Sequence, residues 1–186
     1  DKTEIILHFV EGIKWSDGVP LTVDDFLFYW EDMVLDERFP YTPPAATHIA
    51  GETMEVTKID DFTLKFSFVK PNTLFFTLVN RGFWSSPNWI VPAHYLKQFH
   101  PKYNSELTDE DVQELQDHYD NYHQYPDYPT FKPWKNVSYE EGGKVVFERN
   151  PYYWKVDTEG NQLPYIDRVV SRRIQDPEML VLRTVE

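Results

Sequence analysis

The chain has 186 residues, of which 31 are acidic and 18 are basic, and its formal net charge is −13. This balance disfavours nucleic acid as a partner, because phosphate contacts need clustered Lys and Arg, and it disfavours an anionic membrane surface. A negative surface keeps an exported protein soluble and monomeric, so we expect a monomer. The sequence has no cysteine, which excludes disulfides, thiol nucleophiles and thiolate metal sites.

Hydrophobic residues make up 41% of the chain and aromatic residues 17%. This composition is that of a globular protein with a well-packed core. No apolar run approaches the length of a membrane span. The length fits one domain, and we predict a single domain over residues 1–186.

The first part of the chain predicts a strand, a helix and a hairpin. Residues 5–10 are apolar and β-branched, which is typical of a strand. Thr22 is a good N-cap, and Asp25 three residues later resembles its partner in a capping box. Apolar residues then recur at the spacing of one helix face, which predicts a helix over 23–35. Two runs of alternating polarity within 53–68 predict a β-hairpin with one buried face.

The second part of the chain predicts further short elements. The sequence favours helices over 73–79 and 93–99, a helix with an acidic first turn from Thr108, a proline-punctuated aromatic loop over 121–136, strands over 144–149 and 166–174, and a helix after Asp176. Strands and helices are interleaved without a strict βαβ alternation. This order favours an α+β fold with a twisted, mostly antiparallel or mixed sheet and packed helices.

Four carboxylates crowd the first predicted helix: Asp24, Asp25, Glu31 and Asp32. A glycoside hydrolase needs two carboxylates that face each other across a cleft at a set separation. Carboxylates on one helix face do not supply that geometry, so we interpret these four as a solvated face. We therefore expect no enzymatic activity and no catalytic residues.

Metal and cofactor sites are not indicated by the residue spacing. His118 and His123 are five residues apart, which puts them on different faces of a helix. The sequence has neither a phosphate-binding Gly-Lys loop nor a dinucleotide-binding glycine pattern. We expect neither a metal ligand set nor a cofactor.

Two separated motifs carry the most specific information. Residues 11–18 read Glu-Gly-Ile-Lys-Trp-Ser-Asp-Gly, and Pro-Leu-Thr-Val-Asp-Asp-Phe follows at 20–26. Residues 148–154 read Glu-Arg-Asn-Pro-Tyr-Tyr-Trp. In this order they resemble the extracellular solute-binding proteins of bacterial ABC importers, in the family that takes up oligopeptides, dipeptides and some oligosaccharides (family 5).

The motif residues have an architectural interpretation of their own. Trp15 and Gly18 are expected to fix a turn, and Asp17 is expected to accept backbone hydrogen bonds in it. Glu148 and Arg149 are expected to form an ion pair at a strand end.

The resemblance implies a fold and a role. In the family, two lobes close over a ligand and a smaller third domain packs on one of them. The chain is expected to be that smaller domain, excised from a longer protein, with residues 1–20 and 160–186 belonging to the adjoining lobe. The whole protein is expected to be periplasmic or extracellular, anchored as a lipoprotein. It would capture a peptide or oligosaccharide and pass it to the membrane subunits of an ABC importer.

The candidates for ligand contact are aromatic side chains in loops. Residues 84–135 depart from the family pattern, in a segment that the resemblance brings near the binding cleft. The candidate residues are Tyr41, Tyr128, Phe131 and Trp134, together with Trp84 and Trp89. Sugar rings stack on such faces, whereas peptides need charged clamps for their termini, so these residues favour an oligosaccharide. The alternative function is a carbohydrate-binding module or a non-catalytic fragment of a glycoside hydrolase.

Overall fold

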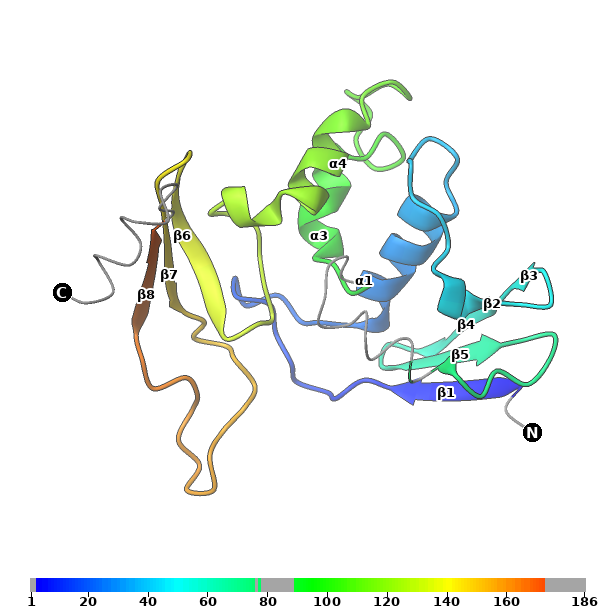
Figure 1. Cartoon of the computed structure of the whole chain (residues 1–186), viewed down its shortest axis with the longest axis horizontal. Coiled ribbons are helices and arrows are strands. Elements are labelled where there is room, and N and C mark those ends of the chain that lie inside the picture. Colours follow the sequence, from blue (N-terminus) through cyan, green and yellow to red (C-terminus); the bar gives the residue numbers. More distant parts are fainter. Residues whose placement is uncertain (1–2, 76, 78–88, 173–186) are drawn as a thin grey trace, which may run out of the picture. The chain divides into compact units, whose positions relative to one another are not determined.

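A computed structural model of the chain describes residues 3–75, 77 and 89–172 (Figure 1). The chain forms two compact units, the first comprising Asp1–Ile13 and Pro20–Asp120, the second Lys14–Val19 and Asn121–Glu186. Trp84 and the helix predicted after Asp176 lie outside the described residues, as does part of the helix predicted over 73–79.

The first unit contains a three-stranded antiparallel sheet in the order β1-β5-β4, formed by β1 (Glu4–His8), β5 (Thr63–Ser67) and β4 (Glu55–Asp60). The predicted hairpin is therefore confirmed, and its buried face carries Leu64 and Phe66. A second, very short antiparallel pair joins β2 (His48–Ile49) to β3 (Glu52–Thr53).

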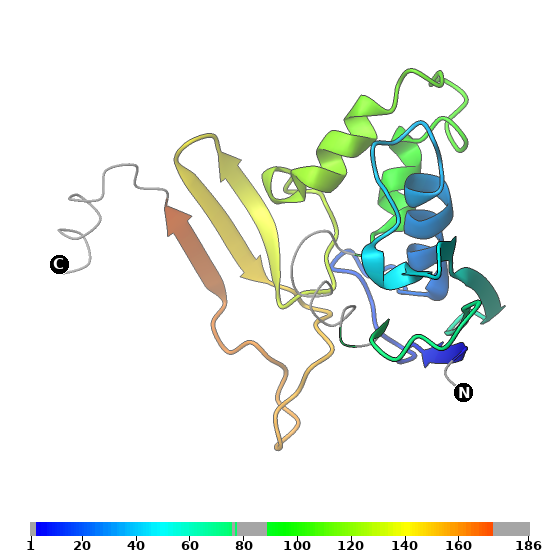
Figure 2. The ribbon, with the colours of Figure 1, turned by 45° about the vertical axis from the view of Figure 1, so that its right-hand side comes forward.

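Helices gather over one side of this sheet, as Figures 1 and 2 show. The elements are α1 (Val23–Leu27), the π-helix η1 (Phe28–Val34), the 3₁₀ turns η2 (Ala45–Thr47) and η3 (Lys97–Phe99), α3 (Ala93–Leu96) and α4 (Gln113–Asp120). The predicted helix over 23–35 is confirmed as α1 and η1. Its second half is wound more widely, since Leu35 N–H donates to Trp30 O, five residues back. Phe26 on α1 contacts Phe66 edge to face at 5.5 Å, which seats the helix on the sheet.

The predicted capping box is present, and its carboxylate, that of Asp25, also accepts a hydrogen bond from a second helix. The Asp25 carboxylate accepts from the Thr22 N–H (3.0 Å) and, through its other oxygen, from the Ala93 N–H at the start of α3 (3.0 Å). Asp25 is 4% exposed. One buried carboxylate thus joins the N-terminal ends of two helices that are distant in sequence.

The interpretation of the acidic helix face as solvated is wrong for two of its four members. Besides Asp25, Asp32 is buried, and it accepts from Lys102 Nζ (2.6 Å) and from the Tyr103 hydroxyl (2.5 Å). Asp24 and Glu31 are exposed. Asp32 is buried because of the tertiary structure: its donors come from a loop some 70 residues later in the chain.

The second unit contains another antiparallel sheet, in the order β6-β7-β8, whose strands run side by side in Figure 2. Its strands are β6 (Trp134–Glu140), β7 (Lys144–Arg149) and β8 (Arg168–Arg172). The strand predicted over 144–149 is confirmed, and the one predicted over 166–174 is confirmed over 168–172. A 3₁₀ turn, η4 (Tyr122–Gln124), lies within the predicted aromatic loop. Antiparallel sheets with few helices confirm the α+β class.

The described residues form neither a membrane-spanning helix nor a cluster of metal ligands. None of their helices is both long and apolar enough to span a bilayer. In the same part of the chain, no group of three or more His, Asp or Glu side chains is placed to hold a metal ion.

The first prediction concerns Asp25. We expect Asp25→Ala to lower the free energy of unfolding by about 2–3 kcal/mol, because two backbone N–H groups lose their buried acceptor. Urea unfolding followed by tryptophan fluorescence measures this. Asp24→Ala is the control, since Asp24 makes only an exposed pair with Lys58 and should cost less than about 1 kcal/mol. Equal effects of the two substitutions would contradict the role of Asp25.

The second prediction concerns His118, which is buried, stacks on Phe99 and hydrogen-bonds to the Tyr95 hydroxyl (2.7 Å). Burial lowers its pKa below the ordinary value, and the charges of Glu114 and Asp117 offset only part of that effect. The neutral ring is therefore favoured in the folded state, so its contribution to stability is complete above about pH 6.5 and is lost as the pH falls through the folded pKa.

Unfolding free energies measured from pH 7.5 to 5 should thus fall more steeply in the parent chain than in His118→Gln. That variant keeps a hydrogen-bond acceptor but does not titrate in this range. Parallel pH profiles would refute the assignment.

Candidate functional site

The first motif forms a tight turn in the second unit. Trp15 N–H donates to Val19 O (2.8 Å), and Gly18 N–H donates to Trp15 O (2.9 Å). Asp17 accepts from the Val19 N–H (3.1 Å), as predicted. Gly18 has φ +92°, a left-handed conformation, and a Cβ at this position would lie 3.2 Å from the Tyr152 ring. Glycine is required here by both its backbone angle and its neighbour.

The second motif places a buried amide at the end of β7. Asn150 is fully buried, and its Nδ2 donates to Thr130 O (3.1 Å) and Lys132 O (3.0 Å). Its Oδ1 accepts from the Tyr152 N–H (2.9 Å), and its own N–H donates to Pro133 O (2.9 Å). Every polar atom of the side chain is used, and three of the four bonds hold the segment 130–133.

The neighbouring Arg149 pairs with Asp167 (3.5 Å), so the predicted ion pair with Glu148 is wrong. Consecutive residues on a strand point to opposite faces, which keeps the side chains of Glu148 and Arg149 apart.

The two motifs converge on the same loop. Ser16 Oγ accepts from the Thr130 N–H (3.1 Å), and the ring of Trp15 meets Phe131 edge to face at 5.5 Å. The motifs therefore act as architecture, as the sequence suggested. Together they hold residues 130–133, which lead into β6.

This loop borders a pocket of about 300 Å³ that lies within the second unit. Its aromatic walls are Tyr122, Tyr128, Trp134 and Phe147. Its polar lining residues are His123, Thr130, Lys132 and Asn136. The structure thus brings together Tyr128 and Trp134, two of the residues singled out from the sequence, and we take this pocket as the candidate site.

Trp134 and Tyr128 differ in how much of each ring is available. Tyr128 is 8% exposed, and its ring packs against Tyr122 at 5.7 Å. Trp134, the first residue of β6, is half-buried. In the described part of the chain its indole makes neither a ring-to-ring contact nor a hydrogen bond through its N–H. Trp134 is therefore the ring best placed to receive a ligand.

The other predicted residues lie elsewhere. Phe131 packs on Trp15 and does not line the pocket. Tyr41 belongs to the first unit, where it stacks on Phe39 and meets Tyr119 edge to face. Burial and then the charge of Asp120 raise the Tyr41 pKa. Trp89, 4% exposed, packs near Phe26 in the core of the first unit.

Most polar groups of the pocket are already satisfied. Asn136 Nδ2 donates to His123 O (2.7 Å), and its Oδ1 accepts from Ser138 N–H at a bulge in β6. Thr130 Oγ1 accepts from the Lys132 N–H (3.1 Å). Sequence reasoning missed Lys132 and Asn136. Strand alternation could have found Asn136, since residues 134 and 136 share one face of a strand.

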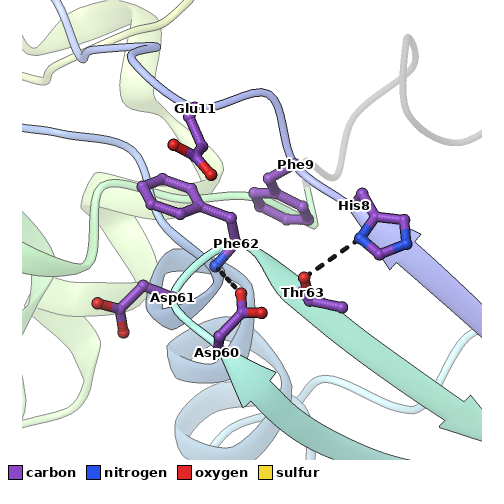
Figure 3. A pocket seen from close by; sticks show the side chains of 7 residues that line it. All are labelled: His8, Phe9, Glu11, Asp60, Asp61, Phe62 and Thr63. Atoms are coloured by element: carbon purple, nitrogen blue, oxygen red, sulfur yellow. Dashed lines mark hydrogen bonds between the residues drawn. The ribbon is translucent and has the colours of Figure 1, made fainter.

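A second hollow, of about 380 Å³, lies at the β4–β5 turn of the first unit (Figure 3). Phe9 and Phe62 form its middle, and Glu11 and Asp60 lie on opposite sides of Phe62. Asp60 accepts from the Phe62 N–H (2.8 Å), a bond that lowers the pKa of this carboxyl. Asp61 pairs with Lys58. These carboxylates stabilise the turn, so we assign this hollow no ligand.

The third prediction concerns Asn150. We expect Asn150→Asp to lower the stability of the second unit by about 3 kcal/mol or more, because it removes two buried donors and buries a charge. Amide hydrogen exchange should become faster in residues 130–134. Asn161→Ala, on an exposed turn where Asn161 bonds only to Asp157, is the control and should leave that exchange unchanged. Unaltered exchange in Asn150→Asp would show that the loop is held by other contacts.

Comparison with known proteins identifies relatives along nearly the whole chain. The periplasmic alpha-galactoside-binding protein of Rhizobium meliloti is 36% identical over 171 residues, which is 91% of this chain and 23% of that protein. The periplasmic oligopeptide-binding protein OppA of Escherichia coli is 30% identical over 173 residues, 86% of this chain and 28% of that protein.

The chain is also similar to solved structures of binding proteins. An oligopeptide-binding protein OppA superposes with a TM-score of 0.81 at 36% identity, over 99% of this chain and 29% of its own. The binding protein MelB of Agrobacterium fabrum C58, in complex with stachyose, gives a TM-score of 0.72 at 34% identity, over 92% of this chain and 24% of its own.

The chain spans about a quarter of the length of these relatives. Residues 1–183 match the family described as bacterial extracellular solute-binding proteins, family 5 Middle. Since the match covers almost every residue, the chain belongs to the family 5 bacterial extracellular solute-binding proteins.

Proposed function

We propose that this chain is part of a longer protein that captures an oligosaccharide and delivers it to an ABC importer without catalysis. The whole protein works in the periplasm or at the outer face of the cell, where a lipid anchors it. Membership of family 5 supports the transport role. The names of two relatives, one for alpha-galactosides and one solved with stachyose, support a sugar ligand.

Sequence identity alone does not separate sugar from peptide, because relatives named for oligopeptides are about equally similar. The observation that carries the choice is the pocket of the second unit. It offers a free Trp134 ring, and no carboxylate is among the described residues that line it. A peptide amino terminus needs an anionic partner, whereas a sugar ring needs an aromatic face with a few hydrogen-bonding groups.

The two compact units suggest how the chain fits into the whole protein. We assign the first unit to the smaller domain and the second to the adjoining lobe. Support comes from the contacts of Ser16 and Trp15 with residues 130–131, which join two distant segments into one body. On this assignment the lobe takes Lys14–Val19 and Asn121–Glu186, in place of the expected 1–20 and 160–186.

The alternative of a carbohydrate-binding module or a glycoside hydrolase fragment is not favoured. The family consists of solute-binding proteins, and the buried carboxylates Asp25 and Asp32 are used to hold helix ends and a loop. An enzyme would hydrolyse its oligosaccharide, and substitution of a carboxylate pair would abolish that turnover.

The fourth prediction tests the ligand class in the whole protein. Calorimetry with a panel of oligosaccharides and oligopeptides should detect saccharide binding. Trp134→Ala should weaken it by about 0.5–1.5 kcal/mol, the scale of one aromatic contact. Trp154→Ala is the matched control, since Trp154 is 47% exposed and lies outside the pocket. Binding of peptides alone would overturn the proposal, as would hydrolysis of the saccharide.

A further inference from the structure

The pocket of the second unit contains an ammonium group that has no anionic partner among the described residues. Lys132 Nζ lies 5.1 Å from the centre of the Tyr122 ring and 3.5 Å from its hydroxyl oxygen. No carboxylate of the described residues pairs with it, whereas Lys102 and Lys144 pair with Asp32 and Glu140. The aromatic contact holds the ammonium in place without neutralising its charge.

Two side-chain oxygens near Lys132 already accept hydrogen bonds from within the second unit. Asn136 and Thr130 use their side-chain oxygens within the unit, as acceptors for Ser138 and Lys132 N–H groups. The Lys132 ammonium therefore has the Tyr122 hydroxyl as its acceptor but no charged partner, and the Trp134 indole N–H has no acceptor, among the described residues. An anionic ligand group would give the ammonium the charged acceptor that it lacks in this part of the chain.

We propose that this pocket binds a sugar residue that carries a carboxylate, a uronic acid, with its ring on Trp134 and its carboxylate at Lys132. The proposal rests on the proposed function, since it names the chemical class of the saccharide unit. A charged donor already held by Tyr122 loses little freedom when it binds an anion, which favours the pair. In a chain of net charge −13, a local cation is also needed to offset the general repulsion of acidic ligands.

The test compares two ligands on the whole protein: trigalacturonate and the neutral galactotriose of the same linkage. Calorimetry should find trigalacturonate bound about tenfold more tightly, the effect of one charge-assisted hydrogen bond. Added salt should reduce that preference, because the ion pair is screened. Affinity for the neutral sugar should not depend on salt.

Substitutions of Lys132 test whether its ammonium causes the preference for trigalacturonate. Lys132→Met keeps the stem over Tyr122 and removes the charge, so it should abolish the preference for trigalacturonate over galactotriose. Lys132→Arg should retain the preference. Lys135→Met is the control, because Lys135 lies on β6, just after the loop of residues 130–133, and is not among the residues that line the pocket.

The outcomes separate this inference from the proposed function. Equal affinity for both saccharides, or a Lys132→Met variant that weakens both equally, would overturn the uronate site while oligosaccharide capture stands. Failure of every saccharide to bind, together with binding of a tripeptide, would overturn the proposed function itself. A tripeptide that binds as the free acid and not as the amide would show that Lys132 binds the carboxylate of a peptide terminus, which also overturns the uronate assignment.

Discussion

The organisation of the second unit depends on one buried amide. The side chain of Asn150 must satisfy two donor hydrogens and an acceptor away from water, because an unpaired buried polar group is costly. It does so entirely with backbone groups, the carbonyls of Thr130 and Lys132 and the N–H of Tyr152. This arrangement ties the end of β7 to the loop that precedes β6, and so sets where Trp134 begins its strand.

The first unit uses the same principle through Asp25. Its carboxylate binds the N–H groups of Thr22 and Ala93 and thereby joins α1 to α3. In both units the buried polar group hydrogen-bonds to backbone atoms. Such bonds do not depend on the side chain that the partner residue carries.

Local patterns predicted the elements well where the decisive contacts are local. The capping box at Thr22, the hairpin within 53–68 and the strand over 144–149 are all present, because capping and alternation depend on residues a few positions apart. The same reasoning misjudged Asp32, whose partners Lys102 and Tyr103 are far along the chain. Helical spacing shows that a carboxylate shares a face with its neighbours, but it carries no information about which donors later fold against it.

The sequence by itself determined the fold class, the family and the turn and cap chemistry, since each rests on short motifs or on periodicity. It also singled out the aromatic loop, but it could not rank the aromatic rings within it. Phe131 packs on Trp15, Tyr128 packs on Tyr122, and Trp134 keeps an open face in the described structure. Only the tertiary structure decided this, because a ring becomes core or surface through neighbours brought in from distant segments. The contact between Trp15 and Phe131 joins residues more than a hundred positions apart, and no local pattern encodes it.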